Sequence, residues 1–408
     1  SGSGVGIRIN LSNLTGLNHI TIENVKVTGG AASQGISVTL NNVGIQSLTV
    51  DQTTVTTTNA NGIDLNLQNI GTAGGADVTV KDSTVRSTNA TGVQVTLGSS
   101  TLSTHLSALT VADSTLEGVG VTSTAGAAFQ TLIDQTSVRN TRVQDGSANP
   151  VARSITYNLT RTTVGDLRVE ENPLLRGLSV TTTDSPLKSA TIADNTINLT
   201  AITTATSGIG INATTTASAV GTAQQSDVTN LLIRTNAITG SLANNNTANG
   251  VVVNLTDSNL GSYTNNSAGA RITANTISNL SSSTGAAVGI QVSASASAAF
   301  VAANDVAGVG NDLPLLLDVF NGSNATGVRS TAAGDLNGIT SNTLTSNNGR
   351  GLVVSTLANT KFLADVTSNT VDGGSGAVTA PNRREGVSMT FTDKPTAVGM
   401  DSFNLNFS

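Results

Sequence analysis

The chain has 408 residues, and its composition excludes several classes of protein. Charged residues make up 11% and hydrophobic residues 37%, which is neither the composition of a disordered chain nor that of a charged globular surface. The formal net charge of −6 argues against nucleic acid as a partner, because phosphate binding needs clustered Lys and Arg. The absence of Cys excludes a disulfide scaffold, and no apolar run approaches the roughly 18 residues of a membrane span.

One short phrase recurs along the chain: an apolar-x-apolar pair, a few polar residues, and then Asn, Ser or Thr placed shortly before another apolar residue. The first copy reads Ile20-Thr21-Ile22 followed by Asn24-Val25. There are about 12 copies at the spacing of solenoid repeats. They lie at Ile20, Leu48, Val78, Leu109, Val138, Leu174, Asn195, Asn236, Asn275, Asn304, Asn342 and Asn369. We expect the recurring polar residue to point inward and form a stack that satisfies the backbone of the turns.

A second phrase, glycine followed by an apolar-x-apolar pair, lies between copies of the first. Its copies begin at Gly35, Gly62, Gly92, Gly177, Gly289 and Gly386. Both phrases alternate with a period of two residues, which predicts strands with one buried face. We expect the glycine to adopt a positive φ where the chain turns a corner.

Each repeat therefore supplies two or three short strands, which must stack on neighbouring repeats to bury their apolar faces. The phrase Asn-Thr-Ile/Val resembles the generic rung of the right-handed parallel β-helix, or pectate-lyase-like, superfamily. The resulting prediction is an all-β, single-domain β-solenoid of about 12 rungs. The predicted chain has a partial N-terminal rung at 1–16, the parallel β-helix at 17–391 and a capping or docking strand at 392–408. The composition resembles bacterial surface β-helices, including autotransporter passengers and adhesins.

The later repeats carry insertions, which we expect to form loops, several of them mobile. They cover residues 145–150, 214–227, 241–249, 256–269 and 309–324. Asp305, Asp312 and Asp318 lie in or near the last insertion and could hold calcium, although no calcium-loop motif is present. The apolar segment 313–320 in the same region is expected to cover the flank of the solenoid.

The two ends contain candidate interface residues. The chain opens inside a repeat, as expected of a processed or trimmed part of a longer protein, and an exposed rung is an open strand edge. The candidates are Ile7, Ile9, Leu11, Phe403, Leu405 and Phe407. The last three fit either a capping strand or a strand that docks onto another copy or an adjoining domain.

The sequence carries no recognisable catalytic motif. Polygalacturonase-like β-helices carry Asn-x-Asp, Asp-Asp, Gly-His-Gly and Arg-x-Lys motifs, and none is present here. His19 and His105 are expected before strands, outside any motif, and Tyr157 and Tyr263 are the only tyrosines that could stack on sugars. We therefore predict no catalytic, cofactor or metal residue.

One local basic cluster could contact an acidic polysaccharide. It consists of Arg350, Arg383 and Arg384. A solvated turn is the plainer interpretation of these residues.

The sequence thus favours a non-enzymatic extracellular rod that builds a cell-surface fibre, filament, layer or adhesin stalk and associates with itself or with adjoining domains. The alternative is a polysaccharide-binding or polysaccharide-cleaving β-helix, and a virus-derived fibre is a third possibility. A column of outward threonines, broken at Arg168, resembles ice-binding solenoids. Its members are Thr21, Thr49, Thr79 and Thr110.

The strand register predicts opposite effects at two adjacent residues. Val80→Asp should cost several kcal/mol of stability, because it buries a charge between rungs. Thr79→Asp should cost little, because this side chain faces outward. Urea unfolding of the two variants measures the difference, and the register is wrong if only Thr79→Asp unfolds the protein.

Overall fold

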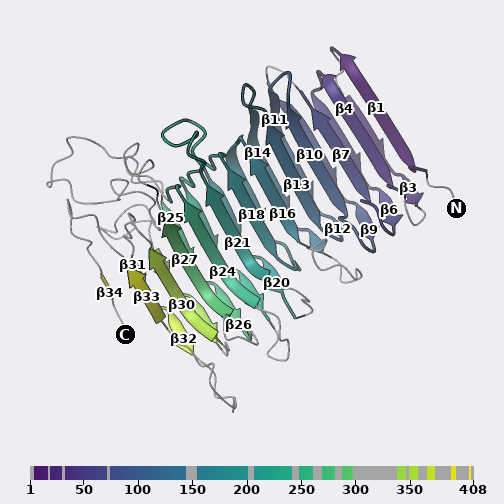
Figure 1. Ribbon diagram of the computed structural model, residues 1–408. Coiled ribbons are helices and arrows are strands. Elements are labelled where there is room, and N and C mark those ends of the chain that lie inside the picture. The colour runs from purple at the N-terminus through teal and green to yellow at the C-terminus, as the bar shows by residue number, and fades with distance from the viewer. Residues whose placement is uncertain are drawn as a thin grey trace. The chain divides into compact units, whose positions relative to one another are not determined.

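The computed structural model describes residues 4–16, 19–29, 33–70, 74–143, 154–200, 206–240, 248–260, 269–280, 287–295, 297, 338–345, 349–356, 365–372, 387–391 and 404–405. All regular secondary structure in these ranges is β-strand (Figure 1). The chain divides into two compact units, Ser1–Val180 and Thr181–Ser408. Strand β18 (Leu178–Thr183) contains the point of division.

Three parallel sheets run through the first unit. The first sheet contains β1 (Ile7–Leu14), β4 (Ile36–Val43), β7 (Ile63–Gln68), β10 (Val93–Ser99), β13 (Val119–Ala125) and β16 (Ile155–Thr160). The second contains β2 (His19–Glu23), β5 (Ser47–Asp51), β8 (Ala76–Lys81), β11 (Thr104–Ala112), β14 (Thr131–Arg139) and β17 (Thr162–Glu170). The third contains β3 (Lys26–Thr28), β6 (Thr54–Thr57), β9 (Thr84–Ser87), β12 (Thr115–Leu116) and β15 (Arg142–Val143).

The second unit repeats this arrangement of parallel strands. Its first sheet contains β21 (Thr206–Thr214), β24 (Ala248–Thr256), β27 (Ala287–Ser295), β30 (Gly349–Thr356) and β33 (Val387–Phe391). Its second contains β19 (Ala190–Ala193), β22 (Leu231–Arg234), β25 (Ala270–Thr273), β28 (Gly338–Thr340), β31 (Asp365–Thr367) and β34 (Asn404–Leu405). Its third contains β20 (Thr196–Asn198), β23 (Ala237–Thr239), β26 (Thr276–Ser278), β29 (Thr343–Thr345) and β32 (Thr370–Asp372). The predicted all-β, parallel, solenoid-like architecture is thus confirmed.

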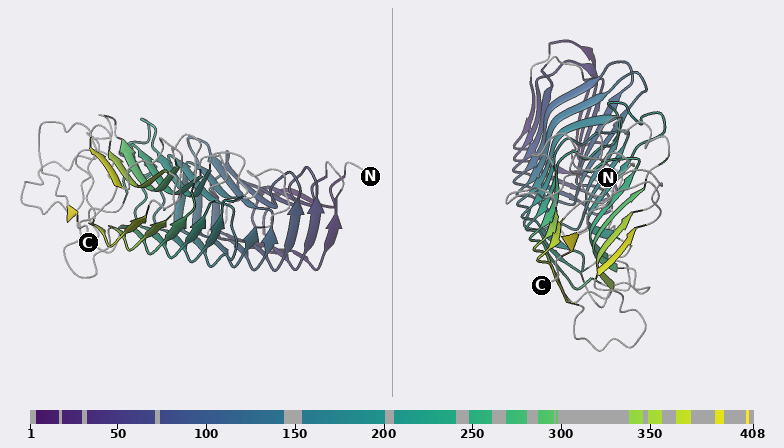
Figure 2. Two further views of the ribbon diagram at one scale, coloured as in Figure 1. Left: turned by 90° about the horizontal axis from the view of Figure 1, so that it is seen from below. Right: turned by 90° about the vertical axis from the view of Figure 1, so that its left-hand side faces the viewer.

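Burial of alternate side chains explains the register. Val50 on β5 pairs with Val80 on β8, and both are fully buried, whereas Thr49 and Thr79 pair on the outward face. Burying one such aliphatic side chain stabilises the fold by about 1.5–3 kcal/mol. Figure 2 shows the strands of the first unit (purple to blue) as layers on either side of this interior. The outward threonine column of the second sheet is present as predicted, and Ser137 and then Arg168 follow it.

A left-handed residue ends each second-sheet strand of the first unit. Asn24 is one of them, with a φ of 55°, and it is exposed and donates to Glu23 Oε1. The expectation that Asn24 belongs to the inward stack is therefore wrong. The corner needs a residue that tolerates positive φ, as Asn and Asp do. At this corner Thr54 N of the next repeat donates its hydrogen bond to the backbone oxygen of Val25.

The glycine before the first-sheet strand has a different role from the expected one in several repeats. Gly35 and Gly62 are not among the residues with positive φ, although Gly118 and Gly177 are, at 154° and 149°. A Cβ on Gly62 would lie 2.2 Å from Val85 Cγ1 and 2.9 Å from the Gly92 oxygen. Close packing against the corner valine therefore requires glycine at this position.

A ladder of asparagines, four of them buried and Asn369 half-buried, runs through the second unit, as the inward stack predicted. Its members are Asn195, Asn236, Asn275, Asn342 and Asn369, and each Nδ2 donates to the next Oδ1 at 2.9, 2.9, 3.0 and 2.9 Å. The backbone N of each of the first four also donates to the next Oδ1, at 3.2, 3.0, 3.0 and 3.1 Å. Asn275 bonds directly to Asn342, 67 residues further along the chain, and the expected copy at Asn304 lies outside the described residues.

Hydroxyl groups take over part of this role in the first unit. Ser83 Oγ accepts a hydrogen bond from Thr53 N at 3.2 Å, and Ser114 Oγ accepts one from Ser83 N at 3.1 Å. Asn172 Oδ1 accepts one from Thr141 N at 2.9 Å. The sequence varies at this position, but a side-chain oxygen satisfies the corner backbone in each case.

The ladder predicts a large cost for one polar-to-apolar change. Asn275→Leu should destabilise the protein by about 3 kcal/mol or more, because it leaves the buried Asn236 N and the Ile233 oxygen without their bonds. Asn158→Leu is the control, since Asn158 is exposed on β16, and should change stability by less than about 0.5 kcal/mol. Chemical denaturation measures both, and equal losses would contradict the importance of the ladder.

Candidate functional site

An extra residue interrupts the second sheet of the first unit. β8 pairs with β11 through Ala76–Leu106 and Asp77–Ala108, so Ser107 has no counterpart in β8. The extra residue continues in β14 as Asp134 and in β17 as Gly165. Such β-bulges redirect side chains and occur often beside functional sites.

Polar side chains meet at this bulge. His105 Nε2 lies 2.9 Å from Asp134 Oδ2, and Ser107 Oγ donates to Asp77 Oδ1 at 2.5 Å. His105 lies inside β11, so the expectation that it precedes a strand is wrong. Gly75 has a φ of +77° and leaves room for this pair, since a Cβ there would lie 3.1 Å from His105 Nε2.

An arginine stands at the far end of the same outward face. Arg168 Nε lies 2.6 Å from Asp166 Oδ2, and its Nη1 lies 3.9 Å from Glu170 Oε2. The hydrogen bond and the charge of Asp166 raise the pKa of Arg168. With Asp77 and Asp134, the outward face thus has several carboxylates and, on neighbouring strands, the guanidinium groups of Arg168 and of the exposed Arg139 on β14.

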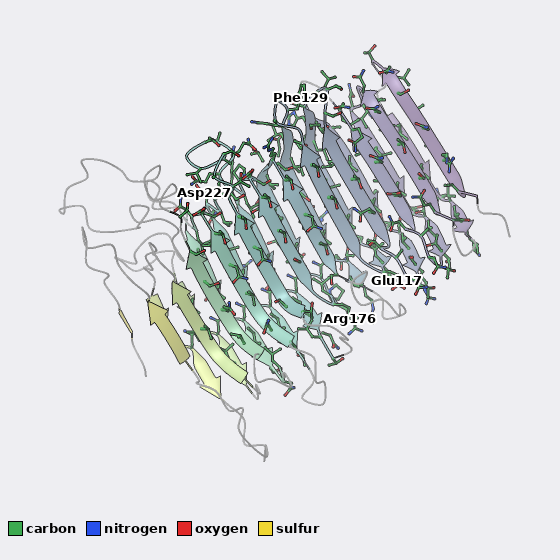
Figure 3. The ribbon with its side chains drawn as sticks, in the orientation of Figure 1. Glu117, Phe129, Arg176 and Asp227 are labelled. Atoms are coloured by element: carbon green, nitrogen blue, oxygen red, sulfur yellow. The ribbon has the colours of Figure 1, made fainter. Side chains whose placement is uncertain are left out.

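Apolar side chains border these charges. Leu102 is 45% exposed and lies in the turn before β11, and the half-exposed Phe129 lies in the turn before β14. Thr104 N donates to the Gln130 oxygen at 3.2 Å, which places the two turns next to each other. Figure 3 shows Phe129 at this end of the strands, and Leu132 pairs with His105 on the outward face. We call the following set the bulge surface: Asp77, Leu102, His105, Ser107, Phe129, Leu132, Asp134, Asp166 and Arg168.

The predicted N-terminal interface residues lie on β1. Ile7, Ile9 and Leu11 alternate along the inward side of the strand and are half-buried. In the described part of the chain β1 pairs with β4 alone, and the β4 residues opposite them are fully buried.

The other predicted site residues are described only in part. Leu405 lies in β34 and pairs with Val366, and Arg350 lies in β30 and pairs with Val288. The remaining candidates lie outside the described residues: Phe403, Phe407, Arg383, Arg384, Tyr263 and the region Asp305–Asp318. Their grouping stays a prediction.

Tyr157 is part of the core. It is 1% exposed, and its OH lies 3.1 Å from Thr136 Oγ1. Burial raises its pKa to about 12. Tyr157 therefore cannot serve as a stacking platform for a sugar on the surface.

The insertion at 214–227 is a hydrogen-bonded turn. Asp184 accepts bonds from Thr216 N and Oγ1 at 2.7 and 2.8 Å. At the other end Asp227, labelled in Figure 3, accepts bonds from Gln225 Nε2 and from Asn259 N, the latter at 2.8 Å. Burial raises the pKa of Asp227 above its ordinary value of 3.8.

The comparisons with known proteins add no relative. No family model, no curated protein and no solved structure matches the chain. Among the residues the structure describes, no cluster of three or more His, Asp or Glu side chains is arranged to hold a metal ion. The same residues contain no helix long and apolar enough to span a membrane.

The raised pKa of Asp227 predicts a pH-dependent contribution to stability. Between pH 3.8 and the raised pKa the folded protein binds more protons than the unfolded chain, so the contribution of Asp227 falls as the pH rises through this window. Asp227→Asn should remove this part of the pH dependence in urea unfolding between acidic and neutral pH. The exposed Glu171→Gln is the control, and an unchanged profile in Asp227→Asn would contradict the prediction.

Proposed function

We propose that this chain is a non-enzymatic extracellular structural protein, a right-handed parallel β-helix of about 12 rungs with pectate-lyase-like architecture. It is a building block of a cell-surface fibre, filament, layer or adhesin stalk, and it associates with itself through its ends. The observation that carries the proposal is the edge of β1, where apolar side chains alternate but stay half-exposed.

The contrast between β1 and its neighbour supports this proposal. Ile7, Ile9 and Leu11 are half-buried, whereas the equivalent residues of β4 are fully buried because strands pair on both sides of them. A further strand on β1 would bury the three side chains and pair the backbone groups of the edge. If a different edge of a second copy supplies that strand, the contact does not close and filaments result.

Polysaccharide binding or cleavage is the second candidate. The observation that favours it is the presence of several carboxylates and one arginine on neighbouring strands at the bulge surface. The outward face of the first sheet adds Asp64, whose pKa burial raises and which accepts a bond from Gln34. The buried position of Tyr157 counts against it, because it removes a stacking platform.

Electron microscopy over a concentration series tests self-assembly. The wild-type protein should form filaments that lengthen with concentration, and Ile9→Lys should abolish them because it places a charge in the contact. Asn10→Lys, an exposed position on the same strand, should leave them intact. Removal of residues 400–408 tests the predicted contribution of Phe403, Leu405 and Phe407.

Isolated particles of wild-type protein at every concentration would overturn self-assembly through the ends. A fibre that survives Ile9→Lys but disappears on truncation would place the contact at the other end alone. Binding of an oligosaccharide on a glycan array, with no filaments, would move the function to the second candidate.

A further inference from the structure

We propose that the bulge surface is a docking site for a protein segment that carries basic side chains next to an apolar one. This inference goes beyond end-to-end assembly, because the surface lies on the outward face of the sheet and not on a strand edge.

The charge of the surface supports a cationic partner. Arg168 is already engaged by Asp166 and by Glu170. Asp77 has the neutral hydroxyl of Ser107 as its partner, and Asp134, whose side chain is 51% exposed, has a histidine. The nine residues of the bulge surface therefore include three carboxylates and one guanidinium, in a chain where only 11% of the residues are charged. Arg139, the exposed arginine on the same face of β14, pairs in register with Glu170 and lies outside this set.

The apolar residues of the bulge surface indicate that the partner segment also carries an apolar side chain. Leu102 is one of two large hydrophobic residues classed as exposed among those the structure describes. Phe129, in the neighbouring turn, and Leu132, on β14, are half-exposed. Exposed apolar side chains rimmed by polar groups are typical of protein contacts. An acidic polysaccharide would meet carboxylates, so these observations favour a basic, partly apolar protein segment.

The spacing of the carboxylates adds a requirement on this segment. Asp77 lies on β8 and Asp134 on β14, with β11 between them. Two strand spacings correspond to about 10 Å. In a polyproline II conformation, basic side chains three residues apart point the same way and lie about 9 Å apart, so a segment in this conformation would run across the strands.

Fluorescence anisotropy with labelled synthetic peptides tests the proposal. The probe is a short peptide with lysines three residues apart and leucines between them. Matched peptides replace either the lysines with glutamate or the leucines with serine. The wild-type protein should bind the lysine–leucine peptide at low salt and neither matched peptide comparably.

Variants of the full chain locate the contact. Asp134→Asn and Leu102→Ser should each weaken binding about fivefold. The controls remove the same groups elsewhere: Glu23→Gln takes an exposed carboxylate from β2, and Leu14→Ser takes the other exposed leucine, from β1. Circular dichroism verifies that each variant keeps its strands.

Three results would overturn the proposal: no binding of the lysine–leucine peptide, equal loss in the control variants, or displacement of the peptide by a neutral oligosaccharide. The test is independent of filament formation. Ile9→Lys should keep full peptide binding, so failure of one proposal can be told from failure of the other.

Discussion

The register of the second unit depends on buried amides that bond to one another and to the backbone at once. Asn275 shows why the residue must be asparagine: its Oδ1 accepts from the backbone and the side chain of Asn236, and its Nδ2 donates to Asn342 and to a strand carbonyl. In a low-dielectric interior such a fully satisfied network is strong, while a partly satisfied one is costly. A slip of one residue would break every bond of this kind together, so the ladder selects one alignment of the repeats.

Much of the framework follows from the sequence because burial alone dictates it. The pairs Val50–Val80 and Thr49–Thr79 are what a period of two residues requires, and the inward asparagines follow from their position beside a corner. The same reasoning misplaces Asn24, because a left-handed corner and an inward stack both favour asparagine. In other repeats the left-handed residue, Gln52 or Asp82, directly precedes the inward residue, Thr53 or Ser83. This order distinguishes the left-handed position from the inward one.

The bulge surface could not be predicted in this way. Ser107, Asp134 and Gly165 are small or polar residues added in the middle of strands, and they shift the outward positions without disturbing the apolar pattern on either side. Bonds across strands, such as His105 to Asp134, join residues 29 positions apart and have no local signature. The chemistry of the outward face is set by position in the sheet, and only the three-dimensional pairing reveals which side chains meet.

The ladder fixes the position of one asparagine in each repeat but leaves the length of the chain between these asparagines variable. Successive ladder asparagines are 41, 39, 67 and 27 residues apart, yet the bonds between them have nearly the same length. The number of residues between two ladder asparagines can therefore vary, provided that each asparagine side chain reaches the same position in the ladder. Loops of new length or composition can accumulate on such a frame by insertion or by duplication of a whole repeat, and natural selection can act on them while the interior stays the same.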